Sequence, residues 1–113
     1  MKTNGTHVFA DVWINEYPEN TKKLIDFIRE NFEKCSITVE NELVHYFSES
    51  AFTAIWLLSE SHFSIHTFPE RNYISMDCYT CGNNSRPLSA ISNIIEMLNV
   101  KHSKISIIER GIN

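Results

Sequence analysis

The chain has 113 residues, of which 42% are hydrophobic and 21% are charged, a composition typical of one globular domain and unlike that of a disordered or membrane-spanning chain. Its formal net charge of −4 has the wrong sign for a nonspecific nucleic-acid binder. The polar first seven residues lack a signal-peptide core, and no apolar run approaches the ~20 residues of a membrane span.

The cysteine count and the size of the chain bear on compartment and assembly. Three cysteines, an odd number, favour reduced thiols, so we expect a cytoplasmic protein. A domain this small buries only about two-thirds of its chain surface, which favours a homodimer that extends the core.

The first half of the chain predicts a strand, a helix and two further strands. Residues 6–14 are rich in β-formers, and Pro18 ends the strand. Asn20 or Thr21 can cap a helix that runs to about Lys34. Strands are expected at 36–47 and 52–58. The apolar positions that face inward are Val8, Ala10 and Val12 in the first strand and Leu24, Ile25, Phe27, Ile28 and Phe32 in the helix.

The second half of the chain predicts two strands, a helix and a final strand. Strands are expected at 63–68 and 73–79, joined by a turn at 69–72, and a last strand at 105–109. A loop at 82–87 leads to a second helix. Its inward positions are predicted to be Leu88, Ile91, Ile94, Ile95 and Leu98.

Helices separated by runs of strands predict an α+β fold. We expect a two-layer α/β sandwich in which a mostly antiparallel sheet carries both helices on one face. Residues 1–113 contain no linker or repeat, so they form a single domain.

The segment 57–70 holds two histidines, two carboxylates and three serines between apolar strands. Alternation along a strand places Ser61, Phe63, Ile65 and Thr67 on one face and His62, Ser64, His66 and Phe68 on the other. A polar strand at a sheet edge explains this pattern without any chemistry.

Two kinds of chemistry compete with that interpretation. His62, His66, Cys78 and Cys81 are zinc-type ligands, but the histidines lie ~13 Å apart along a strand, and we predict no metal site. Ser61 or Ser64 with a histidine and an acid would suit a serine hydrolase. The glycines that flank a nucleophile elbow are absent.

The stretch Ser-Glu-Ser-His-Phe-Ser-Ile-His-Thr-Phe-Pro-Glu at 59–70, followed by Tyr-Thr-Cys-Gly at 79–82, resembles the small bacterial and archaeal S-adenosylmethionine decarboxylases. These are pyruvoyl-dependent enzymes made as self-cleaving proenzymes. The opening Gly5-Thr6-His7 is similar to the start of the family's sequences, and Glu109-Arg110-Gly111 to their end. The resemblance covers nearly the whole chain.

The resemblance implies cleavage between Glu60 and Ser61. Ser61 would attack the Glu60 carbonyl to form an ester, and His66 would remove the Ser61 α-proton so that the ester is eliminated. Thr53 matches a residue that assists processing. The products would be a β chain of residues 1–60 and an α chain of residues 61–113 that begins with a pyruvoyl group made from Ser61.

The resemblance also implies the reaction. The pyruvoyl carbonyl would form a Schiff base with the amine of S-adenosylmethionine and accept the electrons released with carbon dioxide. Cys81 matches the family's proton donor. The product would serve as the aminopropyl donor for spermidine and other polyamines.

The substrate-binding residues implied by the resemblance are Phe47 and Phe68, which would stack on adenine, Glu70, which would bind the ribose hydroxyls, and Phe63, which would line the same pocket. Two positions depart from the family pattern. Phe68 stands where tryptophan is usual, and Arg71-Asn72 replaces a typical Tyr-Gly turn. Two alternatives therefore stay open: a pyruvoyl-dependent decarboxylase for ornithine or arginine, and a non-cleaving homologue that serves as a regulatory subunit.

Overall fold

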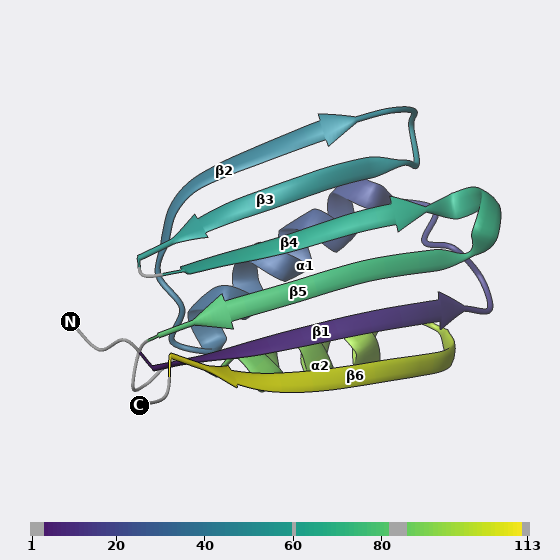
Figure 1. Ribbon diagram of the computed structural model, residues 1–113. Coiled ribbons are helices and arrows are strands. Elements are labelled where there is room, and N and C mark those ends of the chain that lie inside the picture. The colour runs from purple at the N-terminus through teal and green to yellow at the C-terminus, as the bar shows by residue number, and fades with distance from the viewer. Residues whose placement is uncertain (1–3, 60, 82–85, 112–113) are drawn as a thin grey trace.

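The computed structural model describes residues 4–59, 61–81 and 86–111 (Figure 1). Across these residues, no helix combines the length and the apolarity that crossing a bilayer takes. The elements are, in chain order, β1 (Gly5–Ile14), α1 (Thr21–Lys34), β2 (Val39–Tyr46), β3 (Phe52–Leu58), β4 (Ser61–Phe68), a 3-10 turn η1 (Pro69–Arg71), β5 (Tyr73–Thr80), α2 (Pro87–Met97) and β6 (Val100–Arg110).

The strands form one six-stranded sheet in the order β2-β3-β4-β5-β1-β6. Every neighbouring pair is antiparallel. Both helices lie behind the sheet in Figure 1, on the same face. The expected two-layer α+β sandwich is therefore confirmed. We call the face without helices the open face.

Helix α1 begins and ends where local chemistry favours it. The Asn20 side chain accepts a hydrogen bond from the Lys23 backbone N–H at 3.1 Å and so caps the first turn. Leu24, Ile28 and Phe32 follow one another at helical spacing, and all three are buried. Ser36, just past the helix, adopts a left-handed φ of 59°, which turns the chain back towards β2.

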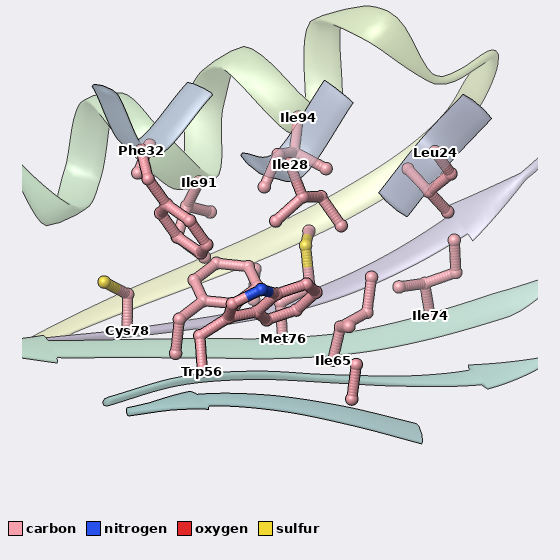
Figure 2. Packing of buried hydrophobic residues seen from close by; sticks show 14 of the residues in the cluster. Leu24, Ile28, Phe32, Trp56, Ile65, Ile74, Met76, Cys78, Ile91 and Ile94 are labelled. Atoms are coloured by element: carbon pink, nitrogen blue, oxygen red, sulfur yellow. The ribbon is translucent and has the colours of Figure 1, made fainter. Parts of the chain in front are cut away.

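The core lies between the helices and the sheet, as Figure 2 shows. Alternate residues of β1, including Val8, Ala10 and Val12, point into it and are buried, as the sequence predicted. The Phe32 ring of α1 contacts the rings of Trp56 and Phe63, whose centroids lie 5.4 and 5.2 Å away. These edge-to-face contacts fix α1 against the middle of the sheet.

Several details differ from the predicted elements, and β4 begins at Ser61 rather than at residue 63. Leu88 was predicted to face inward, but it is exposed, because the buried stripe of α2 centres on Ala90 and Ile94 and Leu88 lies more than a third of a turn away from it. The strand predicted at 36–47 is shorter, Val39–Tyr46. The last strand is longer than 105–109, since its backbone pairs with β1 from Val100 to Arg110.

The open face combines polar side chains with many exposed apolar ones. Strand alternation and register place on it the exposed side chains of Phe9, Trp13, Leu43, Ile55, Leu57, Phe68 and Ile108. So much apolar surface on one side of a small domain is typical of a protein–protein interface.

Candidate active site

Ser61 and Cys81 meet at the end of the sheet where β4 begins and β5 ends. The Cys81 backbone N–H donates a hydrogen bond to Ser61 Oγ at 3.1 Å. Ser61 is the first residue of β4, and Cys81 directly follows β5. Both residues are half-buried. We call this region the cysteine end of the sheet.

His66 and Thr53 meet towards the opposite end of β4. They face each other across β3 and β4, and Thr53 Oγ1 lies 3.2 Å from His66 Nδ1. If Nδ1–H donates to the Thr53 hydroxyl, the lone pair of Nε2 is free to accept a proton. Phe68 is on the same face two residues further along, and η1 follows with Glu70. We call this region the histidine end.

The two ends do not meet within one chain. Ser61 and His66 are five residues apart on a continuous strand, which corresponds to about 17 Å. They also lie on opposite faces of β4, as the alternation in the sequence predicted. His66 therefore cannot reach the Ser61 α-carbon of its own chain in this structure.

The other predicted pocket residues are divided between the two faces. Phe47 is 67% exposed and Phe68 is 39% exposed, and the Phe68 ring stacks on Tyr73 with centroids 5.5 Å apart. Glu70 is exposed. Phe63 has no exposed surface. It points into the core from the opposite face, so its burial in this chain does not support its place in the substrate pocket, which stays a prediction. Glu60 lies outside the described residues.

The other two cysteines lie in the core. Burial raises the pKa of the Cys78 thiol to about 12, and burial also raises the pKa of Cys35, so both stay protonated at neutral pH. The zinc set considered from the sequence does not converge, because Cys78 faces the helices whereas His62 and His66 lie on the open face.

Sequence reasoning missed a cluster around Asp77 near the cysteine end. His7 Nε2 and His62 Nε2 lie 2.7 and 2.8 Å from the same oxygen of Asp77, Oδ2, and the Ser64 hydroxyl donates to its other oxygen. Burial opposes ionisation, but these hydrogen bonds outweigh it and lower the pKa of Asp77. The residues come from β1, β4 and β5, and no sequence spacing signals their contact.

The three ligand-type groups of this cluster lie within 4.8 Å of one another, but the tautomer of His7 argues against a metal ion there. Arg110 Nη1 lies 3.2 Å from His7 Nδ1. A guanidinium is always a donor, so Nδ1 accepts and His7 Nε2 carries the proton that it donates to Asp77. His7 thus has no lone pair to offer a metal at that atom.

Asp77→Asn should lower the free energy of unfolding by about 1–2 kcal/mol at pH 7, because three hydrogen bonds to a carboxylate are weakened. The folded-state pKa lies below the ordinary value of 3.8, so the stabilisation is present above that value and is lost as the pH falls through the lowered pKa. Urea unfolding at pH 7 and pH 3 measures this loss, with Glu30→Gln at an exposed carboxylate of α1 as the control. An equal difference in the free energy of unfolding between wild type and Asp77→Asn at both pH values would contradict this account.

The comparisons with known proteins decide the family. Residues 6–111 match the family model described as S-adenosylmethionine decarboxylase. The chain belongs to this family. A curated relative, the S-adenosylmethionine decarboxylase proenzyme of Brevibacillus brevis, is 36% identical over 116 residues and covers 97% of this chain and 84% of the relative. The S-adenosylmethionine decarboxylase proenzyme of Methanococcus maripaludis strain S2 is 33% identical over 118 residues, and the match covers 99% of this chain and 93% of the relative.

A solved structure agrees with the S-adenosylmethionine decarboxylase fold. The crystal structure of the adenosylmethionine decarboxylase from Aquifex aeolicus superposes with a TM-score of 0.87 at 30% sequence identity, and the match covers all of this chain and 95% of the other. The resemblance drawn from residues 59–70 and 79–82 is thereby confirmed, together with the α+β sandwich.

Proposed function

We propose that this chain is a self-processing decarboxylase that acts on S-adenosylmethionine. It cleaves its own bond between Glu60 and Ser61, and the chain of residues 61–113 then begins with a pyruvoyl group. The observation that carries the proposal is the contact between Cys81 and Ser61 Oγ, in a chain that matches the decarboxylase family almost end to end. The three free cysteines are consistent with the reducing cytoplasm where we place the enzyme.

The residues at the cysteine end fit the formation of such a group. The backbone N–H of Cys81 holds Ser61 Oγ in place. As Oγ attacks the Glu60 carbonyl carbon, its proton passes to the Ser61 nitrogen, which is the leaving group. The peptide C–N bond then breaks and leaves an ester. Removal of the Ser61 α-proton expels the Glu60 carboxylate and leaves an enamine. Hydrolysis of the enamine releases ammonia and gives the pyruvoyl group.

Once formed, a pyruvoyl group supplies a carbonyl that condenses with the substrate amine and draws electrons from the carboxylate that departs. Cys81 is adjacent to that position, where its thiol can deliver the proton that replaces carbon dioxide. Phe47 and Phe68 offer exposed aromatic faces for adenine, and the exposed Glu70 offers a carboxylate for the ribose hydroxyls.

A homodimer resolves the separation of Ser61 from His66. In this dimer the open faces of two protomers pack together. The two-fold axis lies between the two sheets and crosses the strands near the middle of β4. It places the cysteine end of one protomer against the histidine end of the other. His66 of the partner subunit then faces the Ser61 backbone across the two packed open faces and takes the proton of the Ser61 α-carbon, although the Ser61 side chain lies on the other face of β4. The apolar side chains of the open faces are buried between the sheets. Thr53 orients that histidine through Nδ1.

Cleavage in trans tests this arrangement. Ser61→Ala and His66→Ala should each abolish cleavage when expressed alone. When the two variants are co-expressed with different tags, the His66→Ala chain should be cleaved in mixed dimers, because its Ser61 meets the intact histidine of the other chain. A denaturing gel that resolves the tags measures it. If neither chain is cleaved in isolated mixed dimers, each chain depends on its own His66.

Release of labelled carbon dioxide tests the substrate. The purified enzyme is incubated separately with carboxyl-labelled S-adenosylmethionine, ornithine and arginine. We expect release from S-adenosylmethionine alone, because Phe47, Phe68 and Glu70 recognise an adenosyl group that the amino acids lack. Release from ornithine or arginine instead would keep the chemistry and overturn the proposed substrate.

A further inference from the structure

The Tyr79 ring at the cysteine end is fixed by contacts on several sides. Gly5 of β1 lies so close that a Cβ atom there would stand 2.6 Å from Tyr79 Cε1, so a larger residue at this position would push the ring aside. The Arg110 guanidinium lies over the ring at 4.8 Å from its centroid, in cation–π geometry. The His7 ring packs 5.2 Å away, centroid to centroid.

These contacts are themselves anchored in the sheet. Arg110 Nη1 donates to His7 Nδ1, and His7 donates to Asp77. Asp77 is in turn held by Ser64 and His62. The position of the Tyr79 ring is therefore set by a connected network that spans β6, β1, β5 and β4, and not by its own strand alone.

Tyr79 and Cys81 are neighbours on one face of the sheet. The two residues are separated by one position along β5 and its continuation, so their side chains lie next to each other on the open face. The interaction with the Cys81 side chain is the largest cause that raises the pKa of Tyr79. Cys81 in turn contacts Ser61 through its backbone N–H.

We propose that Tyr79 is a positioning residue of the active site: its hydroxyl donates a hydrogen bond to the Cys81 sulfur and aims the thiol at the group formed from Ser61. This inference rests on the proposed function. When the Cys81 S–H bond breaks and its proton passes to the substrate carbon, the sulfur keeps the electron pair, and the Tyr79 O–H stabilises that negative charge. Water then returns a proton to the sulfur.

Tyr79→Phe tests the proposal, because it removes the hydroxyl and keeps the ring between Gly5 and Arg110. We expect complete cleavage, an unchanged KM, and a kcat lower by about ten-fold, the effect of losing one hydrogen bond to a charged atom. Misdirected protonation should also reduce the number of turnovers before the enzyme inactivates. Tyr46→Phe, at an exposed tyrosine of β2, is the matched control and should behave as wild type.

A second readout is independent of turnover. In the native protein Cys81 is the half-exposed cysteine, whereas Cys35 and Cys78 are buried, so iodoacetamide reports on Cys81. Tyr79→Phe should slow this alkylation several-fold at constant pH, because the reactive thiolate loses its donor. The same slowing is expected in the uncleaved Ser61→Ala background, which separates this inference from the proposed function.

Gly5→Ala supplies an independent variant, since its methyl group displaces the Tyr79 ring without removing the hydroxyl. Arg110→Gln removes the cation above the ring. Both should lower kcat and slow the alkylation in the same direction as Tyr79→Phe. Wild-type alkylation and wild-type kcat in folded, cleaved Tyr79→Phe would overturn the proposal, whatever the outcome for the other two variants.

Discussion

Ser61→Ala should leave one uncleaved chain of 113 residues with no carbonyl cofactor and no decarboxylase activity. Alanine has no oxygen to attack the Glu60 carbonyl, so the ester cannot form and the peptide bond remains. The fold should be unaffected, because Ser61 stands at the start of β4 and contributes one hydrogen bond to Cys81. A denaturing gel and an intact mass of the purified variant measure the result.

Ser59→Ala is the matched control for this experiment. Ser59 is exposed, and the bond from its backbone N–H to the Thr38 carbonyl at 3.1 Å survives the substitution. This variant should be cleaved as the wild type is. A cleaved Ser61→Ala chain would exclude Ser61 as the nucleophile and with it the proposed origin of the pyruvoyl group.

Cys81→Ser should separate processing from turnover. The backbone N–H at position 81 still reaches Ser61 Oγ, so we expect cleavage to proceed. A hydroxyl is a much weaker acid than a thiol, so delivery of the proton fails, and kcat should fall by a factor on the order of 10²–10⁴, the usual contribution of a general acid. The variant should also inactivate within few turnovers, because protonation at the wrong carbon converts the cofactor to an amine.

Cys78→Ala is the control for the loss of a thiol. Cys78 is fully buried and its pKa is about 12, so it cannot act as an acid or contact substrate, and the folded variant should keep wild-type turnover. Wild-type kcat and a wild-type lifetime in Cys81→Ser would mean that another group is the proton donor.

Much of the fold could be predicted from the sequence because its periodic positions are the buried ones. Val8, Ala10 and Val12 alternate and are buried, and the apolar stripe of α1 is equally regular. The failures have local causes. Leu88 is apolar but lies off the buried stripe of α2. The first part of β6, with Lys101 and His102, is polar and exposed because it lies at a sheet edge, and its strand conformation comes from backbone pairing with β1.

The candidate site shows where sequence reasoning ends. The pattern around Ser61, His66 and Cys81 identified the family, and strand alternation already separated Ser61 from His66. Strand alternation did not reveal that Cys81 lies beside Ser61 at one end of β4, whereas Thr53 lies beside His66 towards the other end. The contacts of Tyr79 and Asp77 depend on the pairing of β5 with both β1 and β4, which only the sheet order supplies.

One measurement tests the central claim most directly: a denaturing intact mass spectrum after cyanoborohydride treatment with S-adenosylmethionine, ornithine and arginine together. The account predicts two chains, residues 1–60 and 61–113, with the second carrying a reduced adduct of decarboxylated S-adenosylmethionine. That result establishes the cleavage site, the cofactor and the substrate at once. A single uncleaved chain without an adduct would contradict the account and favour a non-cleaving regulatory subunit.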